Sequence, residues 1–154
     1  MQKTVLVHNR RALFDYYIQE RFEAGVVLLG SEVKALRGNK GNLGGAFIEE
    51  KGGELFLKNV HISAYENASY FSHDAVRDRK LLVHKKQCRR LIGQITRKGI
   101  TLIPLSLYLN SKGLIKMEVG LALGRKKEDK RELLKERQWK RDQERLLRKK
   151  TEYE

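Results

Sequence analysis

The sequence has few of the residues that mark disulfide-bonded, membrane-spanning or disordered chains. Its only cysteine, Cys88, cannot build a disulfide framework and fits a reducing cytoplasm. No run of 18 apolar residues occurs, so we expect no transmembrane helix. Residues 1–8 lack the apolar stretch of a signal peptide. With one proline and 40% hydrophobic residues in 154, the chain is long and apolar enough for one packed domain.

Acidic residues are too few to balance the basic ones. There are 33 Lys and Arg against 19 Asp and Glu, a formal net charge of +14. This excess favours a polyanionic partner, with RNA or DNA first and an anionic membrane surface second. Residues 124–154 hold 13 basic and 8 acidic residues but few large apolar ones. We therefore expect a folded domain over 1–123 and a basic, helix-capable tail over 124–154, which is marginal as an isolated helix.

Hydrophobic periodicity predicts short strands and two short helices in residues 1–123. Helical spacing of Phe14, Tyr17, Ile18 and Phe22 after Asn9 predicts the first helix. Residues 26–37 look like a strand interrupted at Gly30. Strands over 46–50 and 54–62 form a hairpin across 51–53. A short strand covers 80–83, and apolar residues between 88 and 95 mark the second helix.

The clearest pattern is an alternation of apolar and more polar residues over 101–109 and again over 115–123. The turn-forming residues 110–113 separate the two segments, which predicts a long antiparallel hairpin with one buried face. About six strands and few helices indicate a mainly β fold. We expect an oligonucleotide-binding-type antiparallel barrel with flanking short helices, although the pattern alone does not fix this topology.

Residues that could carry chemistry are sparse. His8, His61, His73, His84 and Cys88 show no metal-ligand spacing, and no motif for a nucleophile, paired carboxylates or a kinase occurs. We therefore expect no metal, no cofactor and no catalytic residue. The glycine-rich residues 38–45 lead into a strand, which favours a loop over a nucleotide cradle.

Several residues are candidates for binding RNA. Segment 65–80 combines the aromatic residues Tyr65, Tyr70 and Phe71 with His73 and basic residues; it either binds unpaired bases and phosphates or covers the barrel end. Glu23 accepts hydrogen bonds from base amines, or it is an ordinary surface carboxylate or forms an intramolecular pair. Basic side chains that we expect near RNA phosphates are Arg10, Arg11, Lys34, Arg37, Lys40, Arg77, Arg79 and Lys80.

Seven short strings are spread over nearly the whole chain: Asn9-Arg10-Arg11-Ala12, Phe14-Asp15-Tyr16-Tyr17-Ile18, Phe22-Glu23-Ala24-Gly25, Gly30-Ser31-Glu32-Val33-Lys34, Arg77-x-Arg79-Lys80-Leu81-Leu82, Leu105-Ser106-Leu107-Tyr108 and Asp129-Lys130-Arg131. Together they resemble the SmpB family of SsrA-binding proteins. The resemblance implies an RNA-binding protein, not an enzyme. Such a protein binds the tRNA-like domain of transfer-messenger RNA (tmRNA) and delivers it, with elongation factor Tu, to stalled ribosomes for trans-translation in the cytoplasm.

The same resemblance assigns roles to residues. On the RNA-binding face it places Asn9, Arg10, Arg11, Glu23, Lys34, Leu82 and His84. The tail is similar to an extension that enters the empty messenger channel and the decoding centre of the ribosome. The tail residues that we expect at the ribosome are Gly124, Arg125, Lys126, Lys127, Asp129, Lys130, Arg131, Arg137, Trp139 and Lys140. A generic single-stranded nucleic-acid-binding module without ribosome rescue is the alternative.

Overall fold

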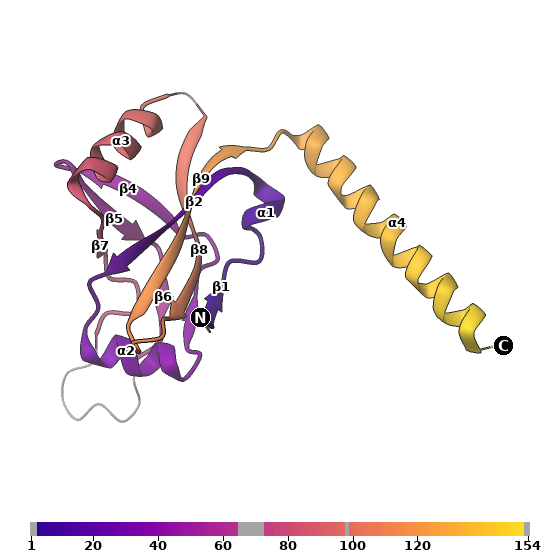
Figure 1. Cartoon of the computed structure of the whole chain (residues 1–154), viewed down its shortest axis with the longest axis horizontal. Coiled ribbons are helices and arrows are strands. Elements are labelled where there is room, and N and C mark those ends of the chain that lie inside the picture. The colour runs from indigo at the N-terminus through magenta and orange to yellow at the C-terminus, as the bar shows by residue number, and fades with distance from the viewer. Residues whose placement is uncertain (1–2, 65–72, 98, 153–154) are drawn as a thin grey trace. The chain divides into compact units, whose positions relative to one another are not determined.

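The computed structural model describes residues 3–64, 73–97 and 99–152. The chain divides into two compact units, Met1–Gly124 and Arg125–Glu154 (Figure 1). We call the first unit the body and the second the tail. None of the described helices is both long enough and apolar enough to cross a membrane.

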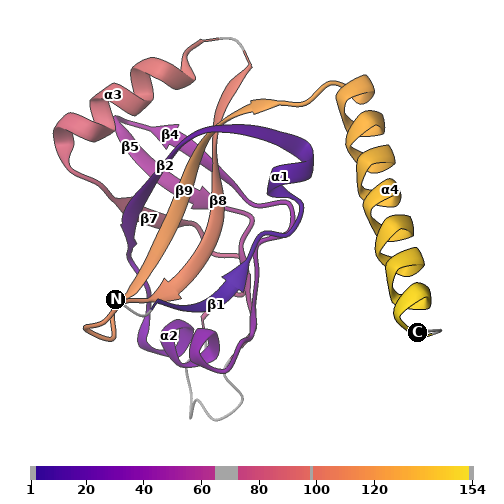
Figure 2. The same ribbon diagram turned by 45° about the vertical axis from the view of Figure 1, so that its right-hand side comes forward.

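Nine strands and three helices of the described residues form the body. The strands are β1 (Thr4–His8), β2 (Tyr16–Val26), β3 (Gly41–Asn42), β4 (Phe47–Lys51), β5 (Glu54–Lys58), β6 (His61–Ile62), β7 (Arg79–Leu82), β8 (Ile100–Leu109) and β9 (Ile115–Gly124). The helices are α1 (Ala12–Asp15), α2 (Gly30–Arg37) and α3 (Lys85–Ile95). Figures 1 and 2 show α2 and α3 at opposite ends of the body.

The main sheet curls into a partly closed antiparallel ring. Its seven strands run in the order β1-β8-β4-β5-β7-β2-β9. Strand β9 also pairs with β8, which closes the ring from β8 to β9 and leaves β1 paired to the edge of β8. Two joints are short, because β4 meets β8 only at Ile48 and Leu102, and β7 meets β2 over two residue pairs. The strands β3 and β6 form a separate pair. The expected mainly β barrel with flanking short helices is confirmed.

The predicted hairpin of β8 and β9 is present, but it is buried on both faces. The whole of β8 from Leu102 to Tyr108 is buried. Leu102 and Leu107 belong to the main core, whereas Ile103 and Leu105 belong to a second cluster with Ala12 of α1. The expectation of one buried face was wrong because α1 and the start of β2 cover the outer side. Every residue of both clusters lies before Gly124.

Two elements near the start differ from the prediction. Helix α1 has only four residues, and the chain becomes strand β2 at Tyr16. The expected helix was wrong because Ile18 and Phe22, four residues apart, share a face in a helix and also in a strand. Residues Gly30–Arg37, expected to be strand-like, form helix α2. The Glu32 side chain accepts a hydrogen bond from the Leu29 N–H at 2.8 Å and so caps the first turn of α2.

Most of the remaining elements lie in predicted segments, whereas β1 and β3 were not predicted. Strands β4 and β5 form the hairpin across Gly52 and Gly53, both of which have positive φ. The second strand is shorter than expected because Asn59, with φ 61°, turns the chain after Lys58. Strand β7 and helix α3 occupy the predicted segments.

Close packing at Gly41 joins three elements of the body. A Cβ atom at this position would lie 2.7 Å from Leu36 Cδ2 of α2 and 2.7 Å from Val7 Cγ2 of β1. Leu36 is fully buried and Val7 nearly so. A Cβ atom at position 41 would therefore force Leu36 and Val7 to shift, which favours glycine there.

Candidate nucleic-acid interface

A cleft of about 770 Å³ opens beside β2, β7 and the first turn of α3. It gathers four of the residues predicted to bind RNA, although they are spread over 62 positions of the sequence: Glu23, Lys80, Leu82 and His84. The turn between β4 and β5 and residue Lys116 of β9 complete the lining. The structure thus brings together a carboxylate, cations and an apolar side chain on one concave surface.

The apolar part of the cleft is Leu82. Its side chain is 52% exposed, whereas the preceding Leu81 is buried in the core, as strand alternation requires. Leu82 pairs with Gly25 of β2. A Cβ atom on Gly25 would lie 3.2 Å from Leu82 Cβ, so glycine allows this close approach. The exposed leucine is therefore held by its backbone neighbours and presents an apolar surface to the cleft.

Cations surround this apolar surface. Lys80 forms a 2.7 Å ion pair with Glu54, and Lys85, Arg89 and Lys116 also line the cleft. Lys85, Arg89 and Lys116 were not among the residues predicted to bind RNA. The alternation along β9 carried a signal for Lys116, since it precedes the fully buried Met117 and points the opposite way.

Glu23 lies where the cleft meets a smaller pocket that Lys3 and Tyr108 line. The buried Tyr108 hydroxyl donates a hydrogen bond to the Glu23 carboxylate. Lys3 Nζ lies 4.6 Å from the centre of the Tyr108 ring. Burial and the Glu23 carboxylate raise the pKa of Tyr108, so the phenol remains a donor. Sequence reasoning missed Tyr108, because nothing local marks a tyrosine 85 residues away as a partner of Glu23.

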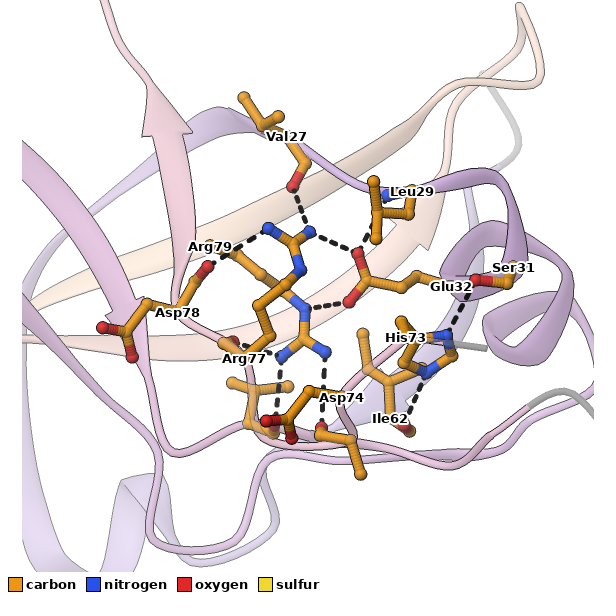
Figure 3. Close-up of polar contacts among 12 residues, drawn as sticks. Val27, Leu29, Ser31, Glu32, Ile62, His73, Asp74, Arg77, Asp78 and Arg79 are labelled. Atoms are coloured by element: carbon orange, nitrogen blue, oxygen red, sulfur yellow. Dashed lines mark hydrogen bonds and ion pairs between the residues drawn. The ribbon is translucent and has the colours of Figure 1, made fainter. Parts of the chain in front are cut away.

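Arg77 and Arg79, both predicted to contact RNA, belong to an internal ion cluster around Glu32 (Figure 3). Arg79 Nε and Arg77 NH2 each lie 2.5 Å from a different oxygen of the buried Glu32. Arg79 has no exposed surface, and its other donors bind the carbonyls of Val60, Arg77 and Ala75. The exposed role expected for Arg79 is therefore incompatible with its position.

The same cluster determines the charge state of Glu32. Burial alone would raise the pKa of Glu32, but hydrogen bonds from Arg77, the Leu29 N–H and Arg79 outweigh it and lower that pKa. Next to it, His73 is buried between Ser31 Oγ and the Ile62 carbonyl. His73 is thus part of the packing beneath α2. The aromatic residues Tyr65, Tyr70 and Phe71, considered with it, lie outside the described residues.

Other predicted residues lie outside the cleft. The Asn9 side chain donates to the Pro104 carbonyl at 2.9 Å, so this amide holds the end of β1 against β8. Arg10 and Arg11 are exposed and line a second groove of about 500 Å³. The basic residues on and just after α2 are exposed but line neither the cleft nor this groove: Lys34, Arg37 and Lys40.

The tail forms one long helix, α4 (Lys127–Glu152). Asp129 accepts a hydrogen bond from the Lys126 N–H at 3.3 Å and helps to cap this helix. Trp139 is 64% exposed, and the basic residues Arg131, Arg137 and Lys140 are exposed as well. Nothing in the sequence of the tail supplies a core for Trp139, which leaves a large aromatic surface for a partner.

Within residues 3–64, 73–97 and 99–152, no three His, Cys, Asp or Glu side chains are grouped so that they could hold a metal ion. The arrangement in the cleft fits recognition of a polyanion that also offers bases. Cations suit phosphates, Glu23 suits an exocyclic amine, and Leu82 suits an apolar contact.

Comparisons with known proteins agree with this arrangement. The family model described as SmpB protein matches residues 6–149. SsrA-binding proteins of Rickettsia peacockii (strain Rustic) and Rickettsia bellii (strain OSU 85-389) are 51% and 50% identical over 148 residues, covering 96% of this chain and 97% and 98% of theirs. A chain from a solved structure of tmRNA-SmpB and the bacterial ribosome is 46% identical, with a TM-score of 0.66, over 82% of this chain and 92% of that one. The chain belongs to the SmpB family.

Proposed function

We propose that this protein binds tmRNA through its body and delivers it to stalled ribosomes for trans-translation. The observation that carries the proposal is the agreement of two independent lines. The chain matches SsrA-binding proteins over almost its full length, and its fold gathers Glu23, Lys80, Leu82 and His84 in one cleft. Because ribosomes and their RNA partners are cytoplasmic, we place the protein in the cytoplasm.

The body contributes the specific contacts with RNA. Cations of the cleft bind phosphates of the tRNA-like domain, and these contacts weaken as salt rises. Glu23 adds a contact that phosphates cannot make, because a carboxylate accepts hydrogen bonds from base amines and repels phosphate. No step requires a covalent bond to the protein, so we propose a binding protein and not an enzyme. We include elongation factor Tu in the delivered complex because of the resemblance to the family.

The tail contributes the recognition of a stalled ribosome. A ribosome at the end of a message has an empty channel lined with RNA, and a basic helix gains phosphate contacts there that offset the cost of ordering it. A channel filled with message excludes the tail sterically. We propose that α4 occupies the empty channel and the decoding centre. The basic residues that we expect to make contacts there lie just before the helix and in its first turns, together with Gly124: Arg125, Lys126, Lys127, Lys130 and Arg131. We treat residues 1–124 as the RNA-binding domain and 125–154 as the sensing tail.

A truncation separates these two roles. A chain stopped after Gly124 keeps the whole of β9 and every residue of both core clusters. It should bind tmRNA nearly as well as the full chain but should not support peptide tagging on stalled ribosomes. Tagging by the truncated chain would overturn the role of the tail.

A full-length variant controls for side effects of truncation. Replacing Lys130 and Arg131 together by alanine leaves the helix length unchanged, and it should also impair tagging while sparing the binding of tmRNA. A generic single-stranded RNA binder would behave differently, because it would bind tmRNA and a random RNA of equal length alike, with the same salt dependence.

A further inference from the structure

We propose that Tyr108 is a positioning residue for Glu23, so that its hydroxyl holds the carboxylate in the orientation that reads the RNA. This inference rests on the proposed function. The Tyr108 hydroxyl donates to Glu23 Oε2, and both residues line the same small pocket. One oxygen of the carboxylate thus accepts the hydrogen bond from Tyr108. The side chain is exposed and lines the cleft, so its other oxygen can accept hydrogen bonds from RNA there.

The position of Tyr108 explains why it can act as a fixed point. It is 2% exposed, although its ring is on the outer side of the sheet and not in the main core cluster. Lys3, whose Nζ lies 4.6 Å from the ring centre, covers the exposed side. Tyr108 pairs with Lys116 of β9, and Lys116 pairs with Gly25 of β2. The hydroxyl therefore comes from a rigid part of the sheet, two strands away from the glutamate that it binds.

Charged groups around Glu23 make this orientation useful. Glu118 is its direct neighbour in register on β9, and Arg21 forms a 2.9 Å ion pair with Glu118. Arg21 therefore pairs with Glu118 and not with Glu23, and none of the described ion pairs includes Glu23. The side-chain hydrogen bond that the described residues give to Glu23 comes from Tyr108. A neutral donor orients the carboxylate and leaves its negative charge in place, whereas a bridging cation would cancel the charge.

A flexible glutamate must be ordered when RNA binds, and a glutamate held in advance avoids that cost. The cost of ordering one such side chain corresponds to a loss of roughly threefold to tenfold in affinity. The loss should appear only with RNA that uses Glu23. It should be absent with RNA that binds through phosphates alone.

The test is a double-mutant cycle in the full-length chain with Tyr108→Phe and Glu23→Ala. The phenylalanine ring keeps the packing and the contact with Lys3, so only the hydroxyl is lost. The probes are a transcript of the tRNA-like domain of a bacterial tmRNA and a shuffled RNA of equal length. Tyr16→Phe is the matched control, because it removes a tyrosine hydroxyl from the opposite end of the same strand as Glu23.

Tyr108→Phe should weaken binding of the tRNA-like transcript about threefold to tenfold and leave the affinity for the shuffled RNA unchanged. In the Glu23→Ala background, it should have no further effect. Additive losses, equal losses on both RNAs, or no loss at all would each overturn the positioning role. Urea unfolding of each variant identifies a merely structural effect, which would follow stability and not the identity of the RNA. If the unmodified protein fails to prefer the tRNA-like transcript, the proposed function itself fails.

Discussion

Replacing Glu32 by glutamine should destabilise the body far more than the same replacement at Glu20. Glu32 and Arg79 are both fully buried and form a 2.5 Å ion pair, whereas Glu20 pairs with Arg90 at 2.6 Å on the exposed surface. Loss of one partner leaves the other charge buried without compensation, which costs about 3–5 kcal/mol. Water solvates the exposed Arg90 in the control, so Glu20→Gln should have little effect.

Urea unfolding at pH 7 measures the free energy of unfolding of each variant. A loss of 3–5 kcal/mol is a large part of the roughly 5–15 kcal/mol that stabilises a typical domain. It should also lower Tm by roughly 6–20 °C for a chain of this size. Equal stability of Glu32→Gln and Glu20→Gln would refute the reasoning, since it would mean that the buried pair contributes no more than a surface pair.

The pH dependence gives an independent check. The pKa of Glu32 is lower in the folded protein than its ordinary value of 4.5. The ionised carboxylate therefore stabilises the fold above pH 4.5, and this contribution is lost as the pH falls through the lower folded value. The difference in unfolding free energy between the unmodified protein and Glu32→Gln should shrink on acidification below pH 4.5. A difference that stays constant down to pH 3 would contradict the assignment.

Two further pairs of substitutions test packing and RNA contacts. Gly41→Ala should cost about 1–3 kcal/mol in urea unfolding because of its close neighbours, whereas Gly93→Ala, in an open position of α3, should stabilise the protein by about 0.5–1 kcal/mol. Leu82→Ala should weaken tmRNA binding without changing its dependence on salt. Lys85→Ala should reduce the salt slope by about one. Equal changes in stability for the two glycine variants, or equal changes in salt slope for Leu82→Ala and Lys85→Ala, would contradict these assignments.

The sequence predicted the elements whose evidence is local. The β8–β9 hairpin follows from alternation around the turn at 110–113, and α3 follows from apolar spacing on one face. By contrast, Ile18 and Phe22 fit both a helix and a strand, so local spacing could not decide. Helix α2 was missed because its start depends on Glu32, whose carboxylate also binds Arg79, 47 residues later. A partner so distant leaves no local pattern.

The candidate site was predictable to the same extent. Leu82, Glu23, Lys80 and His84 were named, and they share the cleft. Composition could not tell Lys80 from its neighbour Arg79, since both are basic. Only the alternation of β7, combined with a buried acid, places Arg79 in the interior and Lys80 on the surface. The positions of Tyr108 and Lys116 in the site follow only from the way in which strands β8, β9 and β2 pair.

Two carboxylates line the cleft; Glu54 is paired with Lys80, whereas the positive charge of the cleft does not explain Glu23. Cations such as Lys85 and Lys116 attract any RNA, and alone they would bind many sequences alike. A carboxylate among these cations weakens the binding of every RNA that places a phosphate beside it. It strengthens the binding of an RNA that places an amine there. Specificity is a difference between affinities, and a repulsive element increases that difference. A carboxylate held by Tyr108 performs this discrimination best, because a glutamate free to rotate could swing away from an approaching phosphate.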